Sequence, residues 1–272
     1  MKSWFLYPAA AASAVLALTA LAAAGLADAA RMAWFGAALA CLPLPLFIAR
    51  TRLTRIVRTS ENLPLLLLVS AAGLLVAGWE AYMERQAEWP PVAVALVGTL
   101  LLVLYVFWYS RFGRFASPKL AVGNKLPDFD LAGLDDVRVR SAELRGKPAV
   151  FLFFSGNECP FCMGQVREIS ARHAELEDLG IRLVLISPQS AARTRKLATE
   201  TGPSSSFRVD RGNAAAQILG IADEGSVLPT VIVTNASGTI LYSDQSDNYR
   251  VRPEPDIYIS ILKRAGTMSS PA

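Results

Sequence analysis

Residues 149–165 read AVFLFFSGNECPFCMGQ, and this stretch decides the fold of the second half of the chain. Its first six residues are all apolar, which is typical of a strand covered on both faces of a parallel sheet. Two cysteines follow, Cys159 and Cys162, and Pro160 stands where proline is favoured in the first turn of a helix. The stretch therefore predicts a buried strand, a short loop and a helix that begins at Pro160.

The position of Cys159 favours redox chemistry. Unpaired amides and the dipole at a helix N-terminus stabilise an anion, so we expect the Cys159 thiol to ionise more readily than a free cysteine. Cys162 lies within one helical turn, close enough to form a disulfide. Glu158 would act in the opposite direction and raise the pKa of Cys159 if its carboxylate lies close to the thiolate. We predict that Cys159 attacks as a thiolate and that Cys162 resolves the product.

A zinc site is the alternative for two cysteines at this spacing. Structural zinc takes four ligands, and the sequence offers only one further cysteine, Cys41, and one histidine, His173. Cys41 lies in an apolar segment and is read as a small buried hydrophobe. His173 lies far along the predicted helix. We therefore predict no metal and no cofactor.

The rest of the second half alternates between strand and helix patterns, which predicts a three-layer α/β domain. With a C-x-x-C pair beside a βαβ pattern, this domain resembles a thioredoxin fold. Strands are expected at residues 129–131, 137–139, 149–154, 181–186, 207–209, 230–234 and 239–242, and helices at 160–179, 190–201, 213–219 and 255–264. Leu228 and Pro229 stand just before one of these strands, where a thioredoxin fold places a cis-proline loop against its cysteines. Pro160, Phe161, Leu228 and Pro229 are the predicted active-site loop residues.

The first half contains four apolar stretches, at residues 4–26, 32–49, 63–79 and 91–110, whose interiors carry no charged residue or histidine. Segments of this length cross a hydrocarbon layer of about 30 Å as helices. Pro43 and Pro45 are expected to kink the second helix, and Gly73 with Ala77 permits close helix packing. We therefore divide the chain into a membrane region, 1–118, and a redox domain, 119–272.

The first stretch has another interpretation, because residues 27–29 resemble the cleavage site of a secretory signal. Its apolar run is longer than a signal core, so we expect an uncleaved helix. Arginines gather in the loop 50–62 and after the last span, and such loops remain in the cytoplasm. This predicts a multi-pass protein of a bacterial-type inner membrane with its redox domain in the cytoplasm; the periplasm is the alternative.

The excess of basic over acidic residues in the chain does not indicate nucleic-acid binding. The net charge of +4 arises entirely in residues 1–118, which hold nine basic and five acidic residues. The second half is neutral, with 18 of each sign. Basic residues beside apolar segments are typical of membrane proteins, so we predict a lipid bilayer and no nucleic acid as a partner.

Five stretches of the second half carry a resemblance to a known family: VG at 122–123 with LPDF at 126–129, LRGKP at 144–148, FFSGNECPFCMGQ at 153–165, ISPQS at 186–190 and NYRVRPEP at 248–255. Residues 122–263 resemble the alkyl hydroperoxide reductase/thiol-specific antioxidant family, the peroxiredoxin-like branch of the thioredoxin superfamily. The resemblance implies that Cys159 attacks and Cys162 resolves. It also implies a peroxide or protein disulfide as substrate and a thioredoxin-like or other dithiol electron donor.

Peroxide and disulfide reduction both remain open. In the pattern P-x-x-x-T/S-x-x-C of the family's peroxidases, Leu152 stands at the proline position and Gly156 at the hydroxyl position, with Ser155 one residue off. An arginine that activates a peroxide could be Arg208, Arg211, Arg250 or Arg252. The alternative from another class is a non-catalytic redox sensor or assembly protein that uses the thioredoxin fold to bind a membrane partner.

Overall fold

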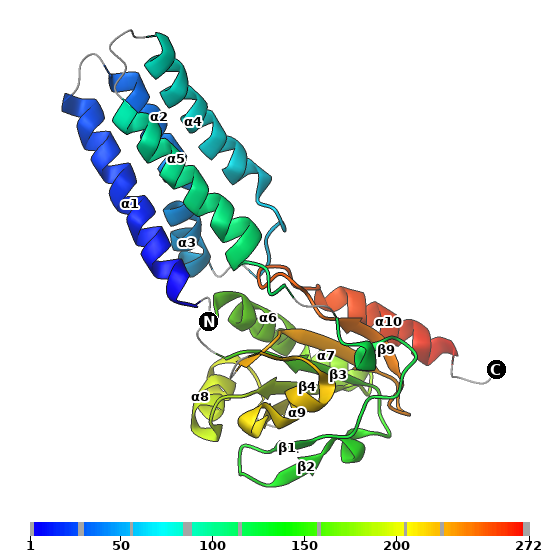
Figure 1. Ribbon diagram of the computed structural model, residues 1–272. Helices are drawn as coiled ribbons and strands as arrows, with labels where there is room; N and C mark the ends of the chain where they lie inside the picture. Colours follow the sequence, from blue (N-terminus) through cyan, green and yellow to red (C-terminus); the bar gives the residue numbers. More distant parts are fainter. Residues whose placement is uncertain are drawn as a thin grey trace. The chain divides into compact units, whose positions relative to one another are not determined.

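The computed structural model of the protein describes residues 3–26, 30–54, 57–83, 89–113, 116–156, 159–203, 206–223 and 226–268 (Figure 1). The chain forms two compact units, Met1–Phe112 and Gly113–Ala272. Two sequence predictions fall outside the described residues: the signal-type cleavage site at 27–29 and the influence of Glu158 on the neighbouring thiol.

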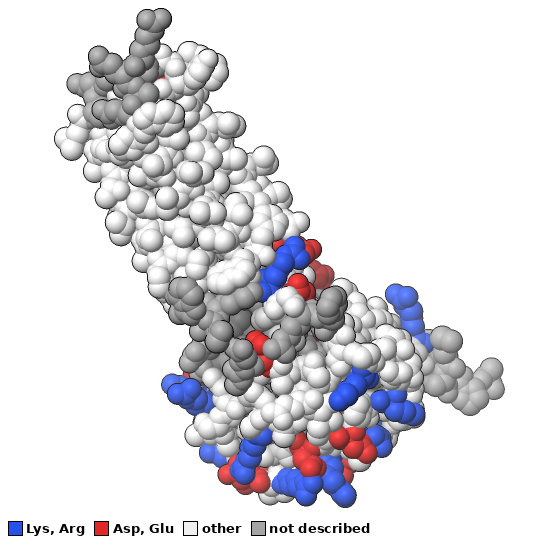
Figure 2. All heavy atoms as spheres, in the orientation of Figure 1, with Lys and Arg blue, Asp and Glu red and all other residues white. Residues whose placement is uncertain are grey.

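The first unit is helical. Its elements are α1 (Ser3–Leu26), α2 (Arg31–Cys41), α3 (Pro43–Leu53), α4 (Pro64–Met83), α5 (Trp89–Val103) and a π-helical turn, Leu104–Tyr109. Within the described residues, four segments are long and apolar enough to cross a membrane: Phe5–Leu26, Arg31–Leu53, Pro64–Met83 and Trp89–Tyr109. The middle of this unit shows neither basic nor acidic side chains on the face seen in Figure 2. The prediction of four long apolar helices is confirmed.

Two local predictions for this unit are also confirmed. The second apolar helix is interrupted at Leu42, directly before Pro43, because proline cannot donate the backbone hydrogen bond that continues a helix. A Cβ atom added to Gly73 would lie 2.5 Å from the backbone nitrogen of Ala40. Only glycine allows α2 and α4 to approach so closely.

The second unit is built on a seven-stranded mixed sheet with the order β2-β1-β5-β4-β3-β8-β9. The strands are β1 (Asp130–Ala132), β2 (Arg138–Arg140), β3 (Ala149–Phe153), β4 (Arg182–Ser187), β5 (Phe207–Val209), β8 (Thr230–Thr234) and β9 (Ile240–Asp244). Strands β3, β4 and β5 run parallel, and β8 pairs antiparallel with β3. A small separate hairpin, β6 (Ala222–Asp223) with β7 (Ser226–Val227), was not predicted.

Helices cover both faces of this sheet. Helices α6 (Pro160–Ala171), α8 (Ala191–Thr201) and α10 (Pro255–Met268) share one apolar core with alternate residues of β3, β4 and β8. On the other face Phe129 packs edge-on against Phe151 and Phe153, and α9 (Ala214–Leu219) lies on that side (Figure 1). The predicted three-layer α/β class with a thioredoxin-like fold is confirmed.

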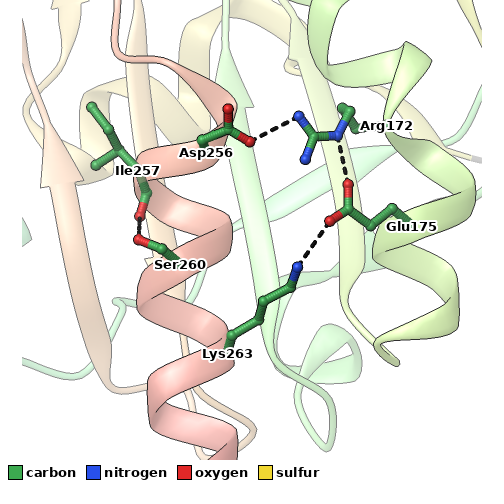
Figure 3. Close-up of polar contacts among 6 residues, drawn as sticks. All are labelled: Arg172, Glu175, Asp256, Ile257, Ser260 and Lys263. Atoms are coloured by element: carbon green, nitrogen blue, oxygen red, sulfur yellow. Dashed lines mark hydrogen bonds and ion pairs between the residues drawn. The ribbon is translucent and has the colours of Figure 1, made fainter.

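One predicted helix, residues 160–179, is divided in two. Helix α6 ends before Arg172, and α7 (His173–Asp178) begins after it. At this break the Arg172 guanidinium donates to Glu175 at 2.5 Å and to Asp256 of α10 at 2.8 Å (Figure 3). Lys263 of α10 also donates to Glu175, at 3.0 Å. These bonds connect the junction between α6 and α7 to α10. The apolar periodicity of residues 160–179 could not predict this contact, because it involves a distant helix.

Candidate active site

The reactive loop begins where β3 leaves the sheet. Cys159 is the N-cap of α6, with an extended backbone, and Pro160 occupies the first turn as predicted. The Cys162 amide donates to the Cys159 sulfur over 3.4 Å, and the Met163 amide donates to the Cys159 carbonyl over 3.0 Å. The first turn of the helix therefore holds Cys159 by both its side chain and its backbone.

The two cysteines differ in accessibility. Cys159 is partly exposed, whereas the Cys162 side chain is fully buried. Both are free thiols, so the structure represents the reduced pair. A reagent from solution can reach Cys159 first. Cys162 is enclosed by the apolar core that α6 shares with the sheet.

Ser155 contributes a hydroxyl to this pair. Its Oγ lies 3.4 Å from the Sγ of Cys162. Sequence reasoning noted Ser155 only as a residue one position away from the hydroxyl of the peroxidase pattern. No pattern in the sequence indicated a contact with Cys162, because the contact depends on how the loop after β3 folds back onto α6.

Arg252 is the arginine whose charge acts on the cysteines. It lies between β9 and α10, is 4% exposed, and donates to the carbonyl oxygens of Asn248 at 3.2 Å and Val251 at 2.7 Å. These bonds hold a cation in the interior beside the reactive pair. Its charge favours the thiolate form of both cysteines.

The two thiols titrate as a coupled pair. The hydrogen bond from Cys159, the charge of Arg252 and the Ser155 hydroxyl and amide lower the pKa of Cys162 to about 5, although burial opposes this. The same thiol–thiol hydrogen bond, burial and the charge on Cys162 raise the pKa of Cys159 well above its ordinary value. Ser155 stabilises negative charge on Cys162. That Cys159 is the cysteine that attacks stays a prediction.

The other candidate arginines lie in other surroundings. Arg211 pairs with Asp136. Arg208 donates to the carbonyl of Phe207 at 2.7 Å, and burial lowers its pKa. Arg250 is fully buried, and its amide donates to the Asn248 side chain. Arg252 is the arginine named among the causes that shift the pKa of both thiols.

Leu228 and Pro229, two of the predicted loop residues, directly precede strand β8. Thr230 of β8 is paired with Phe153 of β3, so Leu228 and Pro229 lie next to the strand end that leads to Cys159. Both are buried. Pro229 has a trans peptide bond, as do all described residues, so the expected cis bond is not found.

Phe161, in the first turn of α6, packs against the segment that follows β9. It is buried, and its ring packs edge-on against Tyr249, with the ring centroids 5.4 Å apart. Tyr249 belongs to the same segment as Arg252. The contact therefore helps to fix this segment against the first turn of α6.

Gly156 has a conformation that a side chain would disturb. Its φ is +130°, and an added Cβ would lie 2.5 Å from the Nε2 atom of Gln189 and 2.6 Å from its Cδ. The Gln189 amide thus packs directly on the backbone of Gly156. A threonine or serine at this position would need both an unusual backbone conformation and a displaced Gln189.

Residues 122–243 match the family model described as "AhpC/TSA family". This match spans 122 of the 272 residues, so the second unit is similar to the AhpC/TSA family. Across 144 residues, 52% of this chain and 80% of the relative, the sequence is 26% identical to "Thiol-disulfide oxidoreductase ResA" of Geobacillus thermodenitrificans. It is 29% identical over 100 residues to "Putative peroxiredoxin bcp" of Helicobacter pylori, where the match spans 37% of this chain and 66% of the relative.

A solved structure similar to this unit is that of Enterococcus faecalis AhpC. The TM-score is 0.46 at 19% identity, and the match covers 54% of this chain and 93% of the other. The sequence relatives support thiol-disulfide oxidoreductase or thiol peroxidase activity for the domain. Within the described residues, no group of three or more His, Cys, Asp or Glu side chains could hold a metal ion.

Proposed function

We propose that this protein is a membrane-anchored thiol oxidoreductase that reduces disulfides through Cys159 and Cys162. One observation carries the proposal: a partly exposed cysteine caps helix α6, and the backbone amide of a second, fully buried cysteine donates to its sulfur. Such a pair offers an accessible sulfur to the substrate and keeps its partner within one helical turn. The relative named as a thiol-disulfide oxidoreductase supports the same chemistry.

The chemistry follows from the shared proton. As the Cys159 sulfur attacks a disulfide, its proton passes to the Cys162 thiolate, a mixed disulfide forms and one substrate thiolate leaves. That thiolate takes the proton from Cys162. The Cys162 sulfur then attacks Cys159 and displaces the second substrate thiolate. The substrate gains two electrons, and a dithiol donor reduces the resulting Cys159–Cys162 disulfide.

Peroxide reduction is a second candidate, and Arg252 favours it. A buried cation beside the pair would stabilise the Cys159 thiolate as it attacks the peroxide oxygen. Cys159 would become a sulfenic acid and release an alcohol or water. Cys162 would then condense with the sulfenic acid to give a disulfide and water. Gly156 offers no hydroxyl to orient a peroxide, which is why disulfide reduction comes first.

The four apolar helices support anchoring in a membrane. We propose that the redox domain faces the cytoplasm, since the arginine-rich connections belong on that side. Fixed to a bilayer, the domain would act on membrane proteins or on lipid hydroperoxides near the surface.

The test uses the full chain in detergent with thioredoxin, thioredoxin reductase and NADPH. NADPH consumption is measured with a disulfide peptide and, separately, with hydrogen peroxide. We expect turnover that disappears in Cys159→Ser and persists in Cys41→Ser, the matched control. Turnover only with the peroxide would move the assignment to a thiol peroxidase. No turnover with either, while the pair still forms its disulfide, would replace the enzyme by the redox-sensor alternative.

A further inference from the structure

A cavity of about 420 Å³ lies beside the start of β4, away from the reactive cysteines. Its lining comes from the first residues of β4, from the turn before β3, from α7 and from the start of β5. Arg182, at the start of β4, pairs with Ala149, the first residue of β3, whereas Cys159 follows the last residue of β3. The cavity is therefore separate from the redox site.

Basic side chains outnumber acidic ones in this lining. The charged members are Lys147, Arg182, Arg208, Glu143 and Glu177. The Glu143 carboxylate accepts a hydrogen bond from Arg140, which lies outside the lining, over 2.9 Å. Among the described residues Lys147 forms no ion pair, and the Arg182 guanidinium donates to a carbonyl oxygen, that of Glu143, over 3.3 Å. The cavity therefore holds more positive charge than its own carboxylates compensate.

Arg182 and Arg208 extend from the same face of two adjacent parallel strands. Arg208 is in register with Ile186, which lies four residues after Arg182 on β4, and side chains alternate along a strand. Burial lowers the pKa of Arg208, the charge of Asp135 counteracts this, and the positive charge of Arg182 lowers it further. An anion bound between the two guanidinium groups would relieve this repulsion.

The rest of the lining limits the ligand to a compact one. Apolar surface comes from Val139, Leu144, Ile181, Leu183 and Val184. The described lining residues include no Phe, Tyr or Trp on which a nucleobase could stack. Guanidinium groups bind phosphate oxygens in a bidentate manner, and three basic side chains suit a doubly charged phosphate better than a single carboxylate. The volume is typical of small-ligand sites.

We propose that this cavity is a second ligand site, which binds a compact phosphate monoester through Lys147, Arg182 and Arg208. The phosphate lies among the three basic side chains, and the aliphatic part of the ligand contacts the apolar residues. Binding depends neither on Cys159 nor on the proposed disulfide reduction. A soluble phosphate ester and the headgroup of phosphatidic acid carry the same phosphate group, and the experiment separates these two sources.

The experiment measures binding to the full chain in detergent by isothermal titration calorimetry. The probes are glycerol 3-phosphate, glycerol, which lacks the phosphate, and a short-chain phosphatidic acid dispersed in the detergent. Lys147→Gln and Arg182→Gln each remove one positive charge from the lining. Lys196→Gln, at an exposed position of α8 outside the lining, is the matched control. Cys159→Ser tests whether binding is independent of the redox site.

We expect glycerol 3-phosphate to bind and glycerol not to bind. Lys147→Gln and Arg182→Gln should each weaken binding by about tenfold, with Lys196→Gln and Cys159→Ser like wild type. Binding of phosphatidic acid alone, with the same dependence on Lys147, would identify a lipid as the source of the phosphate. Absence of binding by both phosphate compounds would overturn the proposal, as would an equal loss in Lys147→Gln and Lys196→Gln. Because Lys147 is exposed, its variant tests the site even if Arg182→Gln does not fold.

Discussion

The hydroxyl oxygen of Ser155 lies 3.4 Å from the sulfur of Cys162, a residue that is fully buried. This contact stabilises negative charge on the inner cysteine of the pair. The ionisation of the pair thus depends on a residue of the loop as well as on the helix N-terminus.

Ser155→Ala should raise the pKa of Cys162. A hydrogen bond to a charged group contributes about 1.5–3 kcal/mol, and one pKa unit corresponds to about 1.4 kcal/mol, so we expect a rise of about one to two units. Ultraviolet absorbance of the thiolate against pH measures it. Ser260→Ala, which removes a hydroxyl bonded only within α10, is the control. An unchanged titration would show that Ser155 does not stabilise the thiolate.

The reactivity of the reduced pair should depend on pH through Arg252. Because the pKa of Cys162 is lowered to about 5, one thiolate is present above that pH and is protonated as the pH falls through it. Alkylation of Cys159 by iodoacetamide should therefore slow below about pH 5. In Arg252→Gln this decline should begin at higher pH, whereas Arg252→Lys should resemble wild type. Identical profiles for all three would remove Arg252 from the site.

Gly156→Ala should destabilise the protein, because the new Cβ meets Gln189. A residue in an unfavourable backbone region costs about 1–3 kcal/mol. Gly123, at φ +92° with nothing within 4 Å of an added Cβ, provides the control for backbone strain alone. Pulse proteolysis in urea should show a larger loss for Gly156→Ala than for Gly123→Ala, and Gln189→Gly should restore part of it. Equal losses would contradict the steric account.

Glu175→Gln should destabilise the contact between α7 and α10 in a pH-dependent way. Arg172 and Lys263 lower the pKa of Glu175 from 4.5 to about 2. The contribution of Glu175 to stability is therefore complete above pH 4.5 and is lost as the pH falls through about 2. The difference in unfolding midpoint between wild type and Glu175→Gln should shrink in acid and in high salt. Glu200→Gln on α8 should show no such trend.

The sidedness of the redox domain can be tested in intact cells. In a Cys41→Ser background, a membrane-impermeant maleimide should label Cys159 only after the cells are permeabilised. Cys159→Ser, Cys41→Ser provides the unlabelled control. Strong labelling of intact cells would place the domain outside the cytoplasm and reverse the orientation taken from the arginine-rich loops.

The sequence alone determined most of the helices and strands and the position of the reactive pair at the start of a helix. Strand β3 and the start of α6 are visible as an apolar run followed by Cys159 and Pro160, and the four apolar helices are visible from their length. These features depend on local composition and periodicity, since neighbouring residues along the chain set them. The interruption before Pro43 was predictable for the same reason.

Only the tertiary structure decided which distant residues act on that pair. In the folded chain the charge of Arg252 acts on the thiols, and the Gln189 side chain packs on the backbone of Gly156. The Ser155 hydroxyl lies next to the Cys162 sulfur. The tertiary structure also divided the helix at Arg172. Each of these depends on packing between segments far apart in the chain, and such contacts leave no periodic pattern because one side chain meets its partner only once the sheet has brought their elements together.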